Sequence, residues 1–210
     1  MKEYFKNMKD KKFLISIGLM LILQCITYAV LKNFQSNYHT FNYSIDNKLP
    51  FIPQMVYIYN IFYPAIFFAF YTVFNKDKDT YYKGIIAGTI GFIIADIIFL
   101  IYPTVMIRPD LATVSMDPLT RLVMEITYNV DTPAINCFPS MHCVFSFQAM
   151  YTIIMSKNLN KKTKYIYSIL LFLIIISTLF VKQHYLIDII SALGIVIITN
   201  IISNLIYKKK

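Results

Sequence analysis

The sequence is poor in charge and glycine, and it contains no tryptophan. Charged residues make up 15% of its 210 residues, with 5 glycines and 8 prolines. So few glycines and prolines exclude a collagen-like or low-complexity chain. A typical soluble domain carries about 25% charged residues, whereas the 15% found here is too little to cover the surface of a water-soluble globule. The composition therefore argues against both a disordered chain and a soluble domain.

Apolar residues are correspondingly frequent. They make up 57% of the chain, and the mean hydropathy is +0.56. A helix that crosses a bilayer needs about 20 mostly apolar residues, and six stretches qualify as candidates. They cover residues 13–31, 51–74, 84–107, 140–155, 165–181 and 184–207. These stretches predict an all-α integral membrane bundle of six transmembrane helices, forming a single membrane domain over residues 1–210.

The basic residues alternate between the two sides of this six-span arrangement. Most of the 20 lie before the first span, in every second loop, and after the last span. Because lysine-rich loops stay in the cytoplasm, both termini are predicted to be cytoplasmic. The remaining basic residues fall on the outer side: Lys32, Lys48, Arg108, Arg121 and Lys182. This distribution accounts for the net charge of +9 without a nucleic-acid partner.

Cysteine occurs three times, an odd number that gives no disulfide framework. Cys137 and Cys143 both fall near the outer side, where a bridge is chemically feasible. The simpler interpretation is that they are small apolar residues. No cysteine and histidine spacing typical of a zinc site occurs. We therefore expect no metal and no cofactor.

His184 and Asp188 form the first candidate pair of functional residues. They are four residues apart and so share one face of the sixth predicted span. A carboxylate in that position fixes the imidazole tautomer and makes the other ring nitrogen a better nucleophile or base. The alternative is a polar pair at a helix start, where the helix dipole also favours an aspartate.

His142 and Arg108 add two further signals. His142 follows Pro139 and Ser140, which are suited to the first positions of a helix, and a helix start presents unpaired N–H groups to a phosphate. Arg108 ends the third predicted span, and its forked guanidinium is suited to phosphate. Taken separately, each has an ordinary interpretation, as a plain helix start and as an arginine that reaches the membrane interface.

Together these residues fall at one membrane boundary. In the six-span arrangement Arg108, Ser140, His142, Lys182, His184 and Asp188 all lie on the outer side. Two imidazoles, two cations, a helix start and a carboxylate are the parts needed for phosphoryl transfer through a phosphohistidine. One imidazole attacks phosphorus and the other protonates the leaving oxygen.

Three motifs resemble those of the type-2 phosphatidic acid phosphatase superfamily. They are Arg108-Pro109, Pro139-Ser140-Met141-His142, and the segment from Ser177 through His184 to Asp188. The usual family patterns are Lys-x6-Arg-Pro, Pro-Ser-Gly-His and Ser-Arg-x5-His-x3-Asp. The sequences around His142 and His184 resemble those of the branch that contains inositol phosphorylceramide synthase and sphingomyelin synthase. The resemblance implies the six-helix core of the phosphatidic acid phosphatase and haloperoxidase fold.

The chain departs from the family patterns at three positions. Ile101 stands at the first lysine, Met141 at the glycine, and Thr178 at the third-motif arginine. Lys182 is a candidate to replace a missing cation. Because a phosphodiester carries less charge than a phosphate monoester, the loss of two cations favours a diester substrate.

The resemblance also implies a role for each matching residue. His184 is expected to be the nucleophile, Asp188 to orient it, and His142 to act first as general acid and then as general base. Arg108, Lys182 and Ser140 are expected to bind phosphate. In the outer loop, Asp131 and Asn136 are the candidates for contacting a lipid headgroup, because they lie closest to the helix start at Ser140.

Three functions follow from this interpretation. The first is a lipid phosphatase that acts at the outer membrane face. The second is a lipid phosphotransferase with an alcohol acceptor, and the third is a non-catalytic membrane protein. A composition rich in Ile, Lys, Asn and Tyr, with no Trp, indicates a bacterial source with an AT-rich genome, and hence a plasma membrane. The expected partner is a lipid phosphate or phospholipid.

Overall fold

The structure, a computed structural model, describes residues 8–41 and 43–207. The lysines at positions 2, 6 and 208–210, which count toward the predicted cytoplasmic side, lie outside the described residues. The all-α prediction is confirmed, because the described residues form helices, turns and two isolated β-bridges but no strand.

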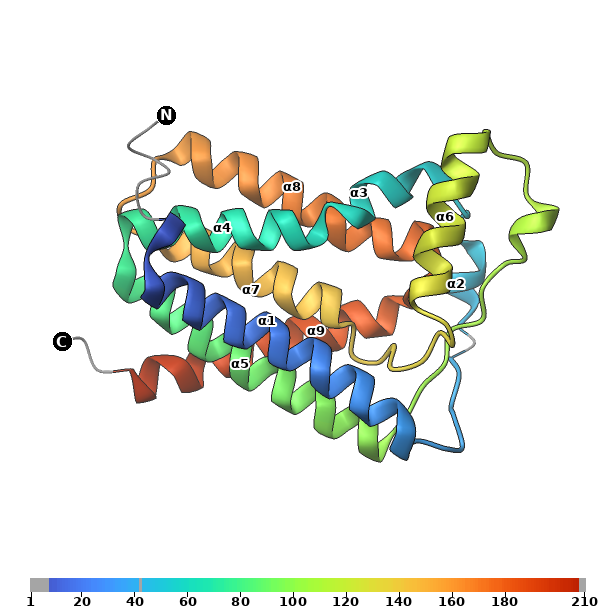
Figure 1. Cartoon of the computed structure of the whole chain (residues 1–210), viewed down its shortest axis with the longest axis horizontal. Coiled ribbons are helices and arrows are strands. Elements are labelled where there is room, and N and C mark those ends of the chain that lie inside the picture. The colour runs from blue at the N-terminus through green and yellow to red at the C-terminus, as the bar shows by residue number, and fades with distance from the viewer. Residues whose placement is uncertain (1–7, 42, 208–210) are drawn as a thin grey trace.

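Six helices run along the long axis of the molecule (Figure 1). They are α1 (Lys11–Leu31), α4 (Phe62–Lys76), α5 (Lys78–Ile101), α7 (Met141–Met155), α8 (Lys161–Phe180) and α9 (Leu186–Ile206). Five described helical segments are long and apolar enough to cross a membrane: Lys11–Phe34, Pro53–Lys76, Lys78–Ile101, Lys161–Phe180 and Leu186–Ile206.

Helix α7 corresponds to the shortest predicted span and has 15 residues. At 1.5 Å per residue it is about 22 Å long, less than the roughly 30 Å thickness of a bilayer core. It packs against α4, α5, α8 and α9, and most of its side chains are buried. A helix surrounded by other helices does not need to match the bilayer thickness, because little of it meets lipid.

The second and third predicted spans differ most from the observed helices, and the other four differ from them by one to four residues at an end. The stretch 51–74 contains a 3-10 turn η3 (Pro53–Met55), a short helix α3 (Val56–Asn60) and α4, with a break at Ile61 between the two helices. Helix α5 begins at Lys78 instead of residue 84, because Asp77 caps it by accepting the Thr80 N–H at 3.1 Å. It ends at Ile101, before Pro103, which has no N–H to continue a helix.

Close contact of α5 with α7 depends on glycine. A Cβ at Gly84 would collide with the side chain of Thr152, coming within 2.8 Å of its Cγ2. Deeper in the bundle, α7 and α9 are joined by an amide pair, in which Asn200 donates to Gln148 at 2.8 Å. These contacts fix α7 as the central helix on which α4, α5, α8 and α9 pack.

The end of the bundle opposite the start of α1 and the end of α9 carries an irregular cap (Figure 1). It includes α2 (Ser44–Lys48), the 3-10 turn η4 (Leu111–Thr113) and α6 (Pro118–Val130). Helix α6 is amphipathic and packs on α3 through Met124 and Tyr128. Its apolar stripe is exposed: Leu119, Leu122, Ile126 and Val130. Asp117 caps α6: its carboxylate accepts hydrogen bonds from the Thr120 hydroxyl and from the Thr120 N–H, the latter at 3.0 Å. These two hydrogen bonds hold the pKa of the Asp117 carboxyl below its usual value.

Candidate active site

Two helix starts meet beneath this cap. Ser140 caps α7, with its hydroxyl oxygen accepting the Cys143 N–H at 3.2 Å. The Ser140 N–H donates to the carbonyl of Asp188 in the first turn of α9, at 3.2 Å. This backbone hydrogen bond holds the two helix starts together. It thereby brings His142, in the first turn of α7, next to His184, just before α9.

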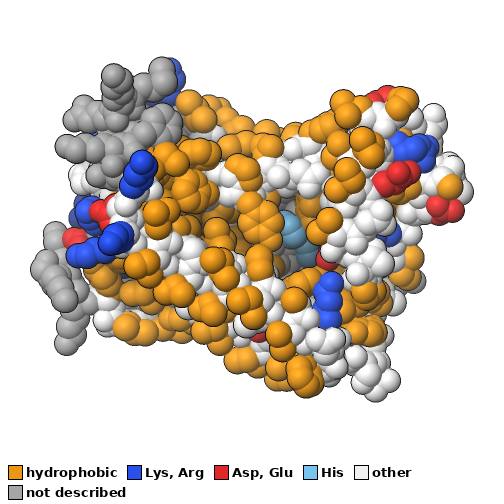
Figure 2. All heavy atoms as spheres, in the orientation of Figure 1, with side chains coloured by type: hydrophobic (Ala, Val, Ile, Leu, Met, Phe, Trp, Pro, Cys, Tyr) orange, Lys and Arg blue, Asp and Glu red, His pale blue; other side chains and the backbone are white. Residues whose placement is uncertain are grey.

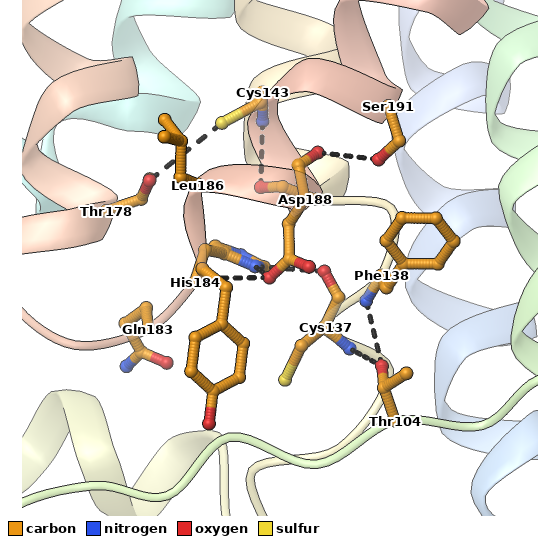
Figure 3. A network of polar contacts seen from close by, with 12 residues as sticks. Thr104, Cys137, Phe138, Cys143, Thr178, Gln183, His184, Leu186, Asp188 and Ser191 are labelled. Atoms are coloured by element: carbon orange, nitrogen blue, oxygen red, sulfur yellow. Dashed lines mark hydrogen bonds and ion pairs between the residues drawn. The ribbon is translucent and has the colours of Figure 1, made fainter. Parts of the chain in front are cut away.

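His184 is held in one tautomer by two acceptors (Figure 3). Its Nδ1 lies 3.0 Å from the carbonyl oxygen of Cys137 and 3.3 Å from Oδ2 of Asp188. Because both partners can only accept, Nδ1 carries the proton and Nε2 keeps its lone pair. Asp188 is fully buried, and its carboxylate is fixed by a further hydrogen bond from the Tyr185 N–H at 2.8 Å. The structure therefore brings these two residues together, although His184 lies just before α9 and not on a face of the helix that was predicted to begin at residue 184.

Thr104 holds the Cys137 carbonyl in position. Its hydroxyl oxygen accepts the N–H groups of Cys137 at 3.1 Å and Phe138 at 2.9 Å (Figure 3). Sequence analysis missed Thr104, because it lies far from both histidines along the chain. Cys137 and Cys143, whose pairing was left open, are both free and buried. Burial raises the pKa of the Cys137 thiol, which keeps it protonated and apolar.

His142 faces the same space as His184. The centroids of the two rings are 5.7 Å apart. The other side of the His142 ring packs on Tyr59 and Phe62, with centroid distances of 4.7 and 4.6 Å. An imidazole held so close to a second imidazole is well placed to give a proton to a group bound between them or to take one from it.

The two imidazoles lie at the inner end of a cavity of about 550 Å³. Its walls come mainly from apolar and aromatic residues of α1, α3, α4 and α6. Its polar end is formed by Asp131, Asn136, His142, Gln183 and His184. Figure 2 shows an imidazole at the bottom of a hollow that is surrounded by hydrophobic side chains on the broad side of the molecule.

Arg108 lies behind this polar end rather than among the residues that line the cavity. Its Nη1 donates to the backbone carbonyls of Tyr128 at 3.3 Å and Asp131 at 3.0 Å. Its Nη2 donates to the carboxylate of Asp131 and to Oε1 of Gln183. Arg108 therefore ties the end of α6 to the turn that carries His184, and its Nε is buried with no hydrogen-bond partner among the described residues.

Lys182 and Ser140 are not brought to the cavity. The Lys182 ammonium donates to the carbonyls of Asp46 at 3.1 Å and Leu49 at 2.7 Å, and it lines a second cavity of about 510 Å³ that also reaches His184. Burial lowers the pKa of Lys182, although nearby Asp46 opposes that effect. Ser140 is fully buried, and its N–H is already used by Asp188.

The two expected headgroup residues do line the first cavity. The Asp131 carboxylate accepts a hydrogen bond from the Tyr28 hydroxyl at 2.7 Å as well as from Arg108. Asn136 is 3% exposed, and its Oδ1 accepts from Gln35. Gln35 comes from the segment after α1, and sequence analysis gave no signal for it.

Lys32 is a cation that sequence analysis placed only in an outer loop. It lines the first cavity at the end of α1, with its Nζ 4.9 Å above the ring of Tyr28. Within the described ranges, no group of three or more His, Cys, Asp and Glu side chains is arranged to hold a metal ion.

One comparison with known proteins gives a match. The family model described as PAP2 superfamily matches residues 84–210, which include most of α5, all of α6 through α9 and both clustered histidines. No curated protein and no solved structure matches the chain.

Proposed function

Because the chain belongs to the PAP2 superfamily, we propose that it is a membrane enzyme that hydrolyses a phosphorylated lipid through a phosphohistidine on His184. Membership supports a phosphatase or phosphotransferase acting on lipids. The observation that carries the finer proposal is the position of the His184 Nδ1 between the Cys137 carbonyl and the Asp188 carboxylate. This arrangement leaves Nε2 as the free nucleophile.

In the first step, Nε2 of His184 forms a bond to phosphorus while the bond from phosphorus to the leaving alcohol breaks. The protonated His142 gives its proton to that alcohol oxygen. The Asp188 carboxylate stabilises the positive charge that develops on the His184 ring, because it accepts the Nδ1–H.

In the second step, His142 takes a proton from water, whose oxygen attacks phosphorus. The bond between phosphorus and Nε2 then breaks, phosphate is released, and His142 is again protonated for the next cycle. Arg108 lies behind the polar end of the cavity, and we propose its Nε–H, which has no hydrogen-bond partner among the described residues, as a donor to phosphate. Lys182 acts in our proposal as part of the frame, because its ammonium donates to the carbonyls of Asp46 and Leu49. Ser140 does so as well, because its N–H donates to the carbonyl of Asp188.

We place this reaction at the outer face of a bacterial plasma membrane. The support is the distribution of basic residues, because lysine-rich ends stay in the cytoplasm. Described lysines gather at the helix ends far from the cavity: Lys9, Lys11, Lys12, Lys76, Lys78, Lys83, Lys157, Lys161, Lys162 and Lys164. The histidine pair lies at the opposite end of the bundle.

A second candidate function is transfer to an alcohol acceptor instead of water. The apolar walls of the cavity favour it, because they offer a lipid alcohol a binding surface and offer water few partners. The first step is the same in both candidates. The difference is which hydroxyl attacks the phosphohistidine.

The test is to trap the intermediate. Purified protein is incubated with lipids labelled at phosphorus, quenched, and examined for an acid-labile phosphoprotein. We expect label in the wild type and none in His184→Ala. His39→Ala is the matched control, because the His39 ring stacks on Tyr102 outside the cavity, with centroids 4.2 Å apart.

Product analysis then separates the candidates. Free phosphate indicates hydrolysis, and a new phospholipid indicates transfer. Equal turnover by wild type and His184→Ala would contradict the phosphohistidine proposal and favour a different site. Loss of label in His39→Ala as well would also contradict the assignment of His184.

A further inference from the structure

The polar end of the first cavity contains buried donors that have no partner. The amide Nδ2 of Asn136 and Nε2 of Gln183 make no hydrogen bond among the described residues, and their residues are 3% and 2% exposed. Both residues line the cavity together with His142 and His184. A buried donor left unpaired destabilises the fold, so two such donors beside His184 indicate a site built for a ligand that accepts hydrogen bonds.

The orientation of the Gln183 amide is fixed by Arg108. The guanidinium can only donate, and it contacts one end of this amide, so that end must be Oε1. The NH2 end is then the unpartnered one. In Figure 3, Gln183 lies beside His184 and takes no part in the network around Asp188.

The orientation of the Asn136 amide is fixed in the same way, through one more residue. Nε2 of Gln35 donates to the backbone carbonyl of Phe99 at 2.8 Å, which fixes it as a donor. The atom of Asn136 that Gln35 also contacts must therefore be Oδ1. Its NH2 group is left unpartnered, like that of Gln183.

The charge at this end of the cavity is small. The Asp131 carboxylate is neutralised by its ion pair with Arg108. His184 is neutral in the tautomer fixed by Cys137 and Asp188. Lys32, at the end of α1, is the lysine that lines this cavity. The protonated His142 adds a second positive charge only until it gives its proton to the leaving alcohol, so the lining supplies about one positive charge to the phosphohistidine. In an apolar surrounding, a second negative charge on the ligand would be left uncompensated at a substantial cost.

We propose that Asn136 and Gln183 donate hydrogen bonds to the non-bridging oxygens of a phosphodiester lipid, and that this neutral amide pair makes the site prefer diesters to phosphate monoesters. The inference rests on the proposed function, because it names the substrate class of the same site. A diester carries one negative charge at neutral pH, which Lys32 balances. A monoester carries nearly two.

The reaction steps also balance for a diester. Nε2 of His184 bonds to phosphorus, the bond to one alcohol breaks, and that alcohol leaves with the proton of His142. The other ester bond remains on the phosphohistidine. An acceptor hydroxyl then gives its proton to His142 and bonds to phosphorus as the bond to Nε2 breaks. With a lipid alcohol as acceptor, the product is a new phosphodiester.

The test compares two lipids with the same acyl chains in one mixed micelle: dioleoyl phosphatidylglycerol, a diester, and dioleoyl phosphatidic acid, a monoester. We expect wild-type protein to consume the diester at least ten-fold faster. Gln183→Leu is expected to lower the diester rate at least ten-fold. Gln183→Arg adds a cation and is expected to shift the preference toward the monoester. Gln54→Leu, at an exposed residue outside the cavity, is the matched control and should behave as wild type.

The outcomes distinguish a failure of the diester preference from a failure of the proposed function. Wild-type turnover of phosphatidic acid in preference to the diester would overturn the inference and leave the phosphohistidine proposal standing. An unchanged ratio in folded Gln183→Leu would also overturn it. If neither lipid gives product or labels His184, the proposed function fails and the inference fails with it. The wild-type ratio decides the substrate class even if the Gln183 variants do not fold.

Discussion

At the scale of single residues, the site depends on buried groups that orient His184. Asp188 is the main one, since its carboxylate accepts the Nδ1–H. We expect Asp188→Asn to lower kcat by roughly 10²- to 10⁴-fold, because the amide no longer stabilises a charged His184 ring. Turnover at saturating lipid is the measurement. Ser191→Ala is the control, because Ser191 bonds only to the backbone carbonyl of Asp188. Equal losses in both variants would indicate a general effect of disturbing α9.

Thr104 allows a second prediction at this scale. Thr104→Val keeps the shape of the side chain but removes the acceptor for two buried N–H groups, those of Cys137 and Phe138. We expect a loss of about 1–3 kcal/mol in unfolding free energy, together with a lower kcat, because the Cys137 carbonyl would no longer be fixed at His184.

Unfolding in detergent and turnover together test this. Thr104→Ser retains the hydroxyl and should recover most of both quantities. Thr113→Val, at an exposed residue, is a control that should change neither. Wild-type turnover by Thr104→Val would show that the Cys137 carbonyl is not needed to orient His184.

The sequence predicts some of these residues and not others, for a physical reason. His184 and Asp188 are four residues apart at the start of α9, so local spacing is enough to pair them. Thr104, Gln35 and Lys32 reach the site through contacts between distant segments, which no spacing along one chain reveals. Lys182 was predicted to bind phosphate because the sequence places it at the same membrane boundary as the histidines. In the structure its side chain points to the carbonyls of Asp46 and Leu49 instead of into the first cavity, and the sequence gives no signal for that contact.

At the scale of helices, the apolar runs predict the main elements well, because each must satisfy its backbone polar groups within lipid. Helix α6 was not predicted. Its apolar residues form a stripe instead of a run, and only the start signal of Asp117 followed by Pro118 marks it. The break at Ile61 between α3 and α4 was also missed. Its signal in the sequence is Pro64, in the first turn of α4, which has no N–H to donate to the carbonyl of Asn60.

The packing of α5 on α7 leads to a prediction for two glycines. Gly84→Ala places a methyl group against Thr152, whereas a Cβ at Gly194 of α9 meets no atom within 4 Å. We expect Gly84→Ala to destabilise the fold by about 1–3 kcal/mol and Gly194→Ala to leave it unchanged or slightly more stable. Thermal unfolding in one detergent compares the two. Equal midpoints would contradict the close approach of the two helices.

At the scale of the whole molecule, the two ends of the bundle differ in chemistry. One end gathers lysines and the other carries the histidine pair, which leads to a prediction about orientation. Labelling uses a Cys25→Ala background, because Cys25 is exposed while the other two cysteines are buried. In intact cells, a membrane-impermeant maleimide should label Ser115→Cys, in the outer segment before α6. It should label Lys157→Cys, between α7 and α8, only after permeabilisation. The reverse pattern would place the site in the cytoplasm.

The hollow that exposes an imidazole lies on the broad side of the bundle, among hydrophobic side chains (Figure 2). A reactant that enters there arrives by diffusing within the lipid layer, so its effective concentration is a surface density. The rate should then follow the mole fraction of the lipid in a micelle rather than its amount per litre. Adding inert detergent at constant lipid would slow the enzyme without inhibiting it. Rate constants for this protein should therefore be expressed against the surface concentration of the lipid, not its bulk concentration.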